Sequence, residues 1–324
     1  MKGAGDRDLT RLYDGAKASR TEGVALALVN PAASAGRAGK VFPELLPALR
    51  AGFPELEVAL TDSPEAAQRV IVEWRRAHSG SPLLVAGGDG TLHEAVNCAV
   101  RTGPVQLGVI PLGSGNDFSR NAGIPLDPRQ AVQRLREARA RPIDLGRLCV
   151  DANHPAVSRV FLNSCSLGVS VRANALARQG SGRLRGWLRY GIAGLRAASH
   201  ARLEHYLVEC GERTLFEGKA LNLTVANGAS FGGGMRISPS SALDDGSLEL
   251  VVLRPMGRLR LIVALARLQR GTHVGLGELS VTPAREQLRI TPACPSPLEA
   301  DGEELETSGT LTIDVLPGAI TLLN

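Results

Sequence analysis

An apolar stretch runs directly into a glycine-rich turn around one carboxylate at residues 82–91 (PLLVAGGDGT). Its glycines, Gly87, Gly88 and Gly90, would let backbone N–H groups approach a polyphosphate without obstruction by Cβ atoms. Since like charges repel, Asp89 is unsuited to attract phosphate directly, but it could hold a metal ion or orient hydrogen-bond donors. We expect a helix over residues 91–100, whose positive dipole end would meet the same ligand. The stretch therefore indicates a nucleotide site for phosphoryl transfer.

Two commoner phosphate-binding motifs do not match the chain. A Walker A loop around residues 39–40 would need glycine and a hydroxyl residue where Ser34 and Val41 stand. A dinucleotide fingerprint beginning at Gly88 would need a glycine where His93 stands. The chain is thus predicted to be neither a P-loop NTPase nor an ordinary dinucleotide-binding protein.

Thr91 and Glu94 also fit a purely structural explanation. Their spacing is that of a capping box, in which both side chains satisfy N–H groups at the start of a helix. The same spacing separates Ser114 from Asp117. Either residue could cap a helix and also contact a nucleotide, so both interpretations stay open at this point.

The N-terminal half alternates strand and helix patterns. We expect an N-cap at Asp62-Ser63 followed by Pro64, a helix starting at Asp127-Pro128, and a helix face formed by Ala67, Val70, Ile71 and Trp74. The alternation predicts an α/β domain with a mostly parallel sheet, whose carboxyl-end loops form a ligand crevice. Polar loops fall there at residues 30–31, 87–91 and 113–117. The expected strands cover residues 24–29, 57–60, 83–86 and 105–110, and a further helix covers 39–51.

After about residue 144 short β-type runs dominate, among them 160–163, 220–226, 247–253, 288–291 and 310–315. They predict a second, largely antiparallel β-sandwich domain. Helices are expected at 183–203 and 261–268. The expected domains are a flexible tail (1–22), an α/β nucleotide-binding domain (23–146) and a β-rich lipid or substrate domain (147–324).

Cysteine usage and hydropathy bear on where the protein works. The five cysteines are scattered without a CxxC pair, which argues against a zinc site or a disulfide framework and favours a reducing cytoplasm. No apolar run approaches the ~20 residues that span a bilayer, and the N-terminus has no signal-peptide pattern. A cytoplasmic location is expected.

The net charge of +5 is concentrated in two arginine-rich segments. Residues 172–202 hold seven arginines and residues 250–277 hold five, with no acidic residue in either. Such segments suit an anionic partner, or they are simply solvated helix faces. Nucleic acid is disfavoured because aromatic residues, the stacking platforms for bases, make up only 3% of the chain.

Two further clusters lie in the C-terminal half. Residues 226–235 (ANGASFGGGM) place three consecutive glycines after an aromatic, which indicates a close backbone approach. Asp244-Asp245-Gly246 by itself reads as a hairpin turn. The acidic residues at 299–304 (EADGEE) are usually solvated in such a turn, but they are also candidates for a general base or a metal site.

Taken together and in this order, the motifs resemble the diacylglycerol kinase catalytic-domain family, particularly its soluble bacterial lipid kinases and their sphingosine kinase relatives. The resemblance covers nearly the whole chain, whereas the GGDG turn alone would be shared with NAD kinases and phosphofructokinases. The matching segments are 29–31 (VNP), 87–97 (GGDGTLHEAVN), 110–118 (IPLGSGNDF), 143–146 (IDLG), 227–239 (NGASFGGGMRISP), 244–248 (DDGSL) and 301–303 (DGE).

The resemblance implies ATP bound in the cleft between two domains, with Mg²⁺. It implies a structural Mg²⁺ on Asp245 and the backbone carbonyls of Ala242 and Ser247, linked to the active site through Asp117 and Asp144. Glu303 would be the general base on the lipid hydroxyl, with Asp301 as the fallback, and Asp89 would organise metal and phosphate. The residues implied for the nucleotide site are Asn30, Thr61, Gly87, Gly88, Asp89, Gly90, Thr91, Glu94 and Ser114, the last replacing a threonine usual in the family.

The implied function is an ATP-dependent kinase for a hydroxyl of a diacylglycerol-like or sphingoid lipid. The arginine segments would then dock the enzyme peripherally on an anionic membrane surface. The alternatives are an NAD kinase-like enzyme and a nucleotide-binding, membrane-associating protein without turnover. The sequence leaves the acceptor lipid and the oligomeric state open, with a homodimer among the alternatives.

Overall fold

The computed structural model describes residues 24–150, 157–179, 192–197, 203–305 and 309–324. These form two compact units, and neither is a single stretch of sequence. The first unit comprises the described residues up to 113 together with 124–143 and 316–324, and the second comprises 114–123 and the described part of 144–315. Strands β5 (Ala140–Val150) and β16 (Leu311–Leu323) each contribute residues to both units.

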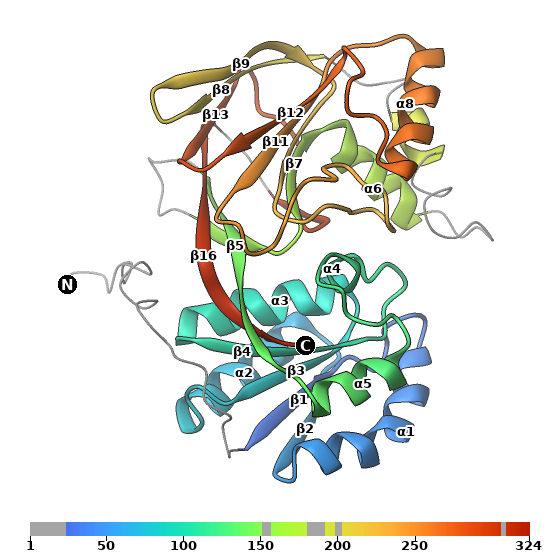
Figure 1. The fold of residues 1–324 in the computed structure, drawn as a ribbon, viewed down its shortest axis with the longest axis vertical. Coiled ribbons are helices and arrows are strands. Elements are labelled where there is room, and N and C mark those ends of the chain that lie inside the picture. Colours follow the sequence, from blue (N-terminus) through green and yellow to red (C-terminus); the bar gives the residue numbers. More distant parts are fainter. Residues whose placement is uncertain (1–23, 151–156, 180–191, 198–202, 306–308) are drawn as a thin grey trace. The chain divides into compact units, whose positions relative to one another are not determined.

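The first unit is an α/β domain built on a parallel sheet, as predicted. Its strands lie in the order β2-β1-β3-β4-β16, and every pairing among them is parallel. Figure 1 shows α1 with α5 on one face of this sheet and α2 with α3 on the other. The strands are β1 (Ala25–Val29), β2 (Leu56–Leu60), β3 (Pro82–Gly87) and β4 (Val105–Pro111), and the helices are α1 (Arg37–Gly52), α2 (Pro64–Ala77), α3 (Asp89–Ala99) and α5 (Pro128–Arg136), with a 3-10 turn at Val100–Thr102.

Local signals placed two of these helices correctly. Ser63 caps α2, accepting a hydrogen bond from the N–H of Ala66 at 3.2 Å, and Pro64 is the first helical residue. Asp127 caps α5 by accepting from the N–H groups of Arg129 and Gln130. A side-chain oxygen at such a position stabilises a helix by about 1 kcal/mol. The apolar face of α2 is buried as expected, through Ala67, Ile71 and Trp74, with Val70 half-buried.

The second unit is an antiparallel β-sandwich, also as predicted. One sheet has the order β12-β11-β10-β7-β14-β15, and the other includes β16, β13, β8 and β9, with β5 and β6. A core of buried apolar side chains lines both sheets. The strands are β6 (Val157–Phe161), β7 (Ser164–Gly168), β8 (Glu204–Cys210), β9 (Arg213–Ala220), β10 (Asn222–Ala226), β11 (Leu248–Leu253), β12 (Leu279–Ala284), β13 (Leu288–Pro292), β14 (Leu298–Ala300) and β15 (Glu303–Leu305).

Helices complete the second unit: α4 (Asp117–Asn121), α6 (Val169–Gln179) and α8 (Arg258–Arg270). The expected helix at 261–268 lies within α8. The apolar run 220–226 is not one strand, because the chain passes from β9 to β10 at Leu221. The predicted tail (1–22) and most of the predicted helix at 183–203 lie outside the described residues. Over the described residues, no helix is both long and apolar enough to cross a bilayer.

Candidate active site

The glycine turn after β3 is held against the loop that follows β4. Gly88 caps α3 in an extended conformation, and a Cβ atom there would lie 3.1 Å from the Cα atom of Gly113. The N–H of Leu112 donates to the carbonyl of Gly87 at 2.8 Å. A Cβ atom at position 88 would thus crowd the backbone of the second loop, and the two glycine-rich loops pack closely against each other.

Of the two explanations left open for Thr91 and Glu94, the capping box is not the one that forms. Helix α3 begins at Asp89, two residues before the expected start, so Thr91 lies inside its first turn and Glu94 is exposed on the second. Helix α4 has Asn116 as its N-cap, in a left-handed conformation with no side-chain cap, so Ser114 and Asp117 do not form a box either. Because Gly88 has no side chain, the first N–H groups of α3 receive no side-chain cap and can meet an anion.

Asn30 and Thr61 lie beside this turn. The amide Nδ2 of Asn30 donates to the Oγ1 of Thr91 at 3.1 Å, and its N–H donates to the carbonyl of Ala86. Thr61, only 4% exposed, donates its N–H to the carbonyl of Val29 at 2.8 Å. The first unit thus brings Asn30, Thr61 and residues 87–91 to the carboxyl edge of its sheet, as the parallel topology predicted.

A second group of predicted residues lies in the second unit and centres on Asp117. Its Oδ2 accepts from the N–H of Gly233 at 2.8 Å, inside a run of three glycines, 232–234, with φ of 63°, 82° and 97°. All three angles are in the left-handed region, which explains the consecutive glycines. The other oxygen, Oδ1, is buried without a hydrogen-bond partner among the described residues. Such an oxygen is a candidate acceptor for a ligand or for water.

Burial raises the pKa of Asp117 from its ordinary value of 3.8, against the opposing effects of the Gly233 and Gly234 N–H groups and of Arg120. The negative charge of Asp301 adds to the increase in this pKa. Folding therefore disfavours the ionised form of Asp117 relative to its neutral form.

This shift predicts a pH-dependent effect of Asp117→Asn on stability. Because the folded-state pKa is raised, folding binds protons, so the free energy of unfolding falls as pH rises from 3.8 through the raised value. In metal-free protein, the change in melting temperature caused by Asp117→Asn should therefore be more positive at about pH 8 than at about pH 4. Calorimetry at the two pH values measures this, and an equal effect at both would contradict the inferred linkage.

Asn121 joins three segments and was missed from the sequence. Its Nδ2 donates to Asn163 Oδ1 and to the carbonyl of Ser230, both at 2.8 Å, while its Oδ1 accepts from the N–H and the hydroxyl of Ser230. Asn227 donates Nδ2 to the carbonyls of Asp144 and Leu162. These amides fix the segment 227–233, which positions the glycine run. The only signal for this role in the sequence was the number of asparagines in the motifs.

Glu249 was also missed. It is 8% exposed within β11, and it accepts hydrogen bonds from the hydroxyls of Ser238, Ser240 and Ser241. One acidic residue in an otherwise apolar strand (LELVVL) was the available signal. Its contacts fasten the loop after the glycine run to the sheet.

The proposed metal turn is shaped by Asp144. The Oδ2 of this buried residue accepts from the N–H of Gly246 at 2.8 Å, and its own N–H donates to the carbonyl of Leu243. Asp245 is exposed and accepts from the N–H of Ser247 at 3.0 Å. Asp245 and the carbonyls of Ala242 and Ser247 form an all-oxygen set, which fits Mg²⁺. No cluster of three or more His, Cys, Asp or Glu suited to a metal occurs in the described part of the chain, so carbonyls and water would have to complete the shell.

Asp301 and Glu303 lie on the hairpin between β14 and β15, with different environments. Asp301 and Gly302 form its two-residue turn, with φ of 50° and 83°. Both oxygens of Asp301 are occupied: Oδ2 accepts from Leu162 N–H, and Oδ1 from Asn163 and Ser164 N–H, at 2.8–3.2 Å. Glu303 is half-buried on the strand that follows. Asp301 thus clamps the chain between β6 and β7, and Glu303 lies beside this clamp on the same hairpin.

The predicted site residues therefore fall into two groups. One is in the first unit (Asn30, Thr61, Gly87, Gly88, Asp89, Gly90, Thr91, Glu94) and the other is in the second (Ser114, Asp117, Asp144, Ala242, Asp245, Ser247, Asp301, Glu303). Ser114 is exposed. That both groups act on one nucleotide in a cleft stays a prediction.

Two family models match the chain. The diacylglycerol kinase catalytic domain matches residues 24–148, and the YegS C-terminal NAD kinase beta sandwich-like domain matches residues 163–324. Among solved structures, a diacylglycerol kinase from Bacillus anthracis superposes with a TM-score of 0.71 at 22% identity, covering 93% of this chain and 96% of that one. Yeast NADH kinase superposes less well, with a TM-score of 0.51 at 10% identity over 94% of this chain and 83% of that one. Both likenesses concern the fold.

Sequence relatives specify the family more closely. A protein of Pseudomonas aeruginosa named probable lipid kinase YegS-like is 32% identical over 267 residues, which are 82% of this chain and 83% of the relative. A protein of the same name from Stenotrophomonas maltophilia is 28% identical over 83% of this chain and 86% of the relative. With its catalytic and C-terminal domains both matched, the chain belongs to the YegS-like lipid kinase family and carries a diacylglycerol kinase catalytic domain.

Proposed function

We propose that this chain transfers the γ-phosphoryl group of ATP to a hydroxyl of a diacylglycerol-like or sphingoid lipid, with Mg²⁺. The observation that carries the proposal is the open N-terminus of α3 behind the glycine turn. Its N-cap residue, Gly88, supplies no side-chain cap and packs against the backbone of Gly113. Backbone donors at a helix N-terminus are suited to phosphate oxygens.

Residues around the turn would orient the nucleotide. Asn30 holds Thr91 by a hydrogen bond, so the Thr91 hydroxyl has a fixed position from which to donate to a phosphate oxygen. Thr61 is held to the end of β1 on the other side. Positioning of this kind is the main protein contribution to phosphoryl transfer, since the transition state demands little covalent chemistry from the enzyme.

Two sets of oxygen atoms could serve divalent cations. Asp89 in the first turn of α3 would hold a cation next to the phosphates, and Asp245 with its two neighbouring carbonyls would hold a structural one. When bound, Mg²⁺ supplies charge neutralisation on the transferring group. Asp144 shapes the turn that carries Asp245.

Glu303 is the better general base of the two candidates. A base must accept the proton of the attacking hydroxyl, and a carboxylate that several backbone N–H donors hold in place is less suited to that task. Asp301 uses both of its oxygens on three backbone N–H groups. We therefore assign Glu303 the proton transfer and Asp301 the task of holding the hairpin turn that presents it.

The second unit also contains a small apolar cavity. It measures about 90 Å³ and is lined mainly by aliphatic side chains of the β10–β11–β12 face and of α8, including Val251, Leu265 and Leu268. Its lining suits alkyl groups, but its volume is well below the ~300–1,000 Å³ of a typical ligand site, so only a few methylene groups would fit. A nicotinamide dinucleotide, the acceptor in the NAD kinase alternative, would instead need polar partners for its phosphates and riboses.

Label transfer from γ-phosphate-labelled ATP into a panel of lipids in mixed micelles tests the proposal. We expect labelled product with at least one diacylglycerol-like or sphingoid lipid, and we expect no NADP⁺ from NAD⁺. Formation of NADP⁺ would establish the NAD kinase alternative. Tight ATP binding without transfer to any lipid of the panel would instead establish a binding protein without turnover.

A further inference from the structure

Helix α8 has two apolar faces, and the described residues of the chain bury only one of them. Leu261, Ala264 and Leu268 are buried, and Leu268 belongs to a cluster with β11 and β12. On the opposite side, Leu259 is 81% exposed, and Ile262 and Val263 are each 48% exposed. With Ala266 they follow the i, i+3, i+4, i+7 spacing of one helix face. A surface helix normally turns such a stripe toward the core.

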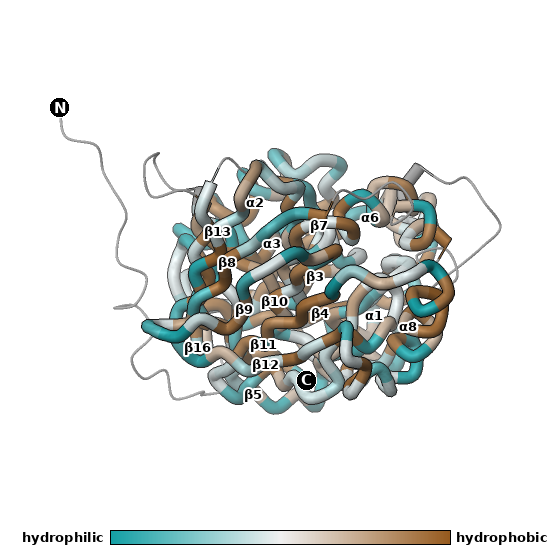
Figure 2. The backbone as a smooth tube through the Cα atoms, turned by 90° about the horizontal axis from the view of Figure 1, so that it is seen from above, coloured by the Kyte–Doolittle hydropathy of each residue, from teal (hydrophilic) through white to brown (hydrophobic). Residues whose placement is uncertain are grey.

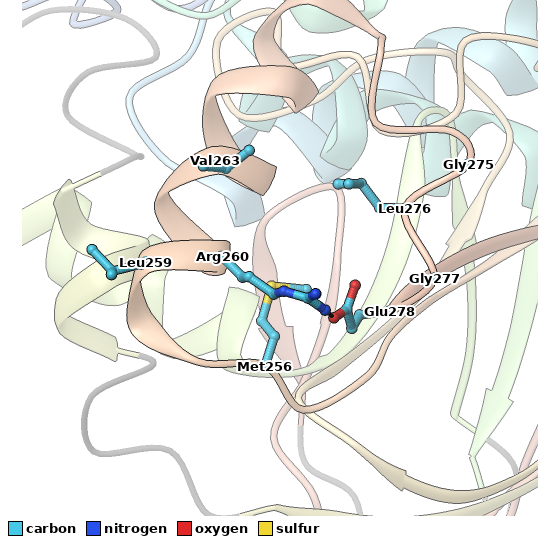
Figure 3. Close-up of a pocket in the computed structure, with 8 residues that line it drawn as sticks. All are labelled: Met256, Leu259, Arg260, Val263, Gly275, Leu276, Gly277 and Glu278. Atoms are coloured by element: carbon cyan, nitrogen blue, oxygen red, sulfur yellow. Dashed lines mark ion pairs between the residues drawn. The ribbon is translucent and has the colours of Figure 1, made fainter.

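Arginines flank this outer stripe. Arg258, Arg267 and Arg270 are exposed, and residues 250–277 contain no acidic residue. Arg260 forms an ion pair with Glu278 (Figure 3). Figure 2 shows the resulting alternation of hydrophobic and hydrophilic segments along α8. The long side chains can lay their alkyl stems along the apolar stripe while their guanidinium groups reach outward.

The apolar surface continues from the helix onto the loop before β12. Val274 is 61% exposed, and a groove of about 710 Å³ separates α8 from residues 275–278. Met256, Val263 and Leu276 line it (Figure 3). We call the outward side chains of 258–270 together with residues 274–277 the α8 surface.

We propose that the α8 surface docks this protein on an anionic lipid bilayer, with its aliphatic side chains in the interfacial region and its arginines on lipid phosphates. An amphipathic helix with cationic residues beside exposed aliphatic ones has the chemistry of an interfacial helix. A second copy of the chain fits worse, since a two-fold contact would bring like-charged arginines together. The proposal rests on the proposed function, in which the acceptor is dissolved in a membrane.

Sedimentation with vesicles of phosphatidylcholine containing phosphatidylglycerol, compared with pure phosphatidylcholine, tests the proposal. The wild type should bind the anionic vesicles preferentially, and less so at high salt. Arg258→Gln combined with Arg267→Gln and Arg270→Gln should weaken binding by on the order of 100-fold. Leu259→Gln combined with Ile262→Gln should weaken it by about tenfold or more.

Matched controls lie in the first unit. Arg69→Gln combined with Arg76→Gln and Arg134→Gln removes the same charge from exposed positions, and Val58→Gln combined with Leu126→Gln removes exposed aliphatic groups. Both controls should bind like the wild type. Equal binding of the wild type to neutral and anionic vesicles would overturn the proposal. So would unchanged vesicle binding by the α8 variants. The proposal would also fail if the α8 substitutions abolished self-association of the protein and left its vesicle binding unchanged.

A non-ionic mixed-micelle kinase assay separates this proposal from the proposed function. The α8 variants should phosphorylate micellar lipid at wild-type rates and fail only with vesicles. If the wild type phosphorylates no lipid at all, the kinase proposal fails, while vesicle sedimentation still decides the role of the α8 surface. Loss of micellar activity in the α8 variants would contradict a docking role.

Discussion

Replacing Asp89 by alanine should reduce label transfer from ATP to lipid by on the order of 10³-fold, to the background of the assay. Asp89 lies in the first turn of α3, directly behind the glycine turn. A carboxylate there repels a triphosphate unless a cation lies between them. Asp89→Ala should therefore weaken ATP binding when Mg²⁺ is present and leave it unchanged or tighter when Mg²⁺ is chelated. Titration calorimetry with and without the metal measures this change of sign.

Glu65→Ala provides the matched control for Asp89→Ala. Glu65 is also an acidic residue in the first turn of a helix of the same unit, but α2 does not follow the glycine turn. Both substitutions remove a favourable charge–dipole interaction worth about 0.3–1 kcal/mol, so their effects on the melting temperature should be similar. Only Asp89→Ala should affect transfer. Full activity of the Asp89→Ala variant would contradict the prediction, because the Asp89 carboxylate would then only stabilise the helix and have no role in phosphoryl transfer.

The α/β half of the fold was predictable because its signals are local. The buried strands β1 and β3 are short continuous apolar runs. Ser63 and Asp127 mark the starts of helices because their side chains accept hydrogen bonds from N–H groups two or three residues later. Local signals could not decide whether Thr91 forms a capping box. A hydroxyl followed by a glutamate looks identical whether it starts a helix or lies one turn inside it. The start of α3 at Asp89 adjoins the packing of Gly88 against Gly113, a contact between residues 25 positions apart that no local pattern reports.

Long-range pairings lie beyond such signals. The end of β16 pairs in parallel with β4, so the last residues of the chain complete a sheet that begins near its start. Nothing in the composition of residues 316–324 distinguishes this from pairing within the β-sandwich. Likewise, the glycines at 232–234 indicated a close approach, but their partner, Asp117, is 116 residues away. Family resemblance could place these residues in one site, whereas only the structure shows which atoms they contact.

Glu303→Gln and Asp301→Ala should separate catalysis from folding within one hairpin. Glu303→Gln removes the proton acceptor, so kcat should fall by about 10²–10⁴-fold with little change in melting temperature, because this residue is half-buried and lies at the start of a short strand. Asp301→Ala leaves three backbone N–H groups without their carboxylate. Their loss should cost on the order of 3 kcal/mol, or about 6–12 °C in melting temperature for a unit of this size.

Glu304→Gln is the control for both variants of the hairpin. Glu304 follows Glu303 on β15 and therefore points to the other face, where it is exposed opposite Glu299. It should retain wild-type activity and stability. If Asp301 were the base, Asp301→Asn, which keeps an acceptor oxygen for the backbone, would abolish transfer while Glu303→Gln remained active. Because three backbone donors hold the Asp301 carboxylate in place, we expect the reverse: Asp301→Asn should lose stability and keep activity at low temperature, and Glu303→Gln should stay folded and inactive.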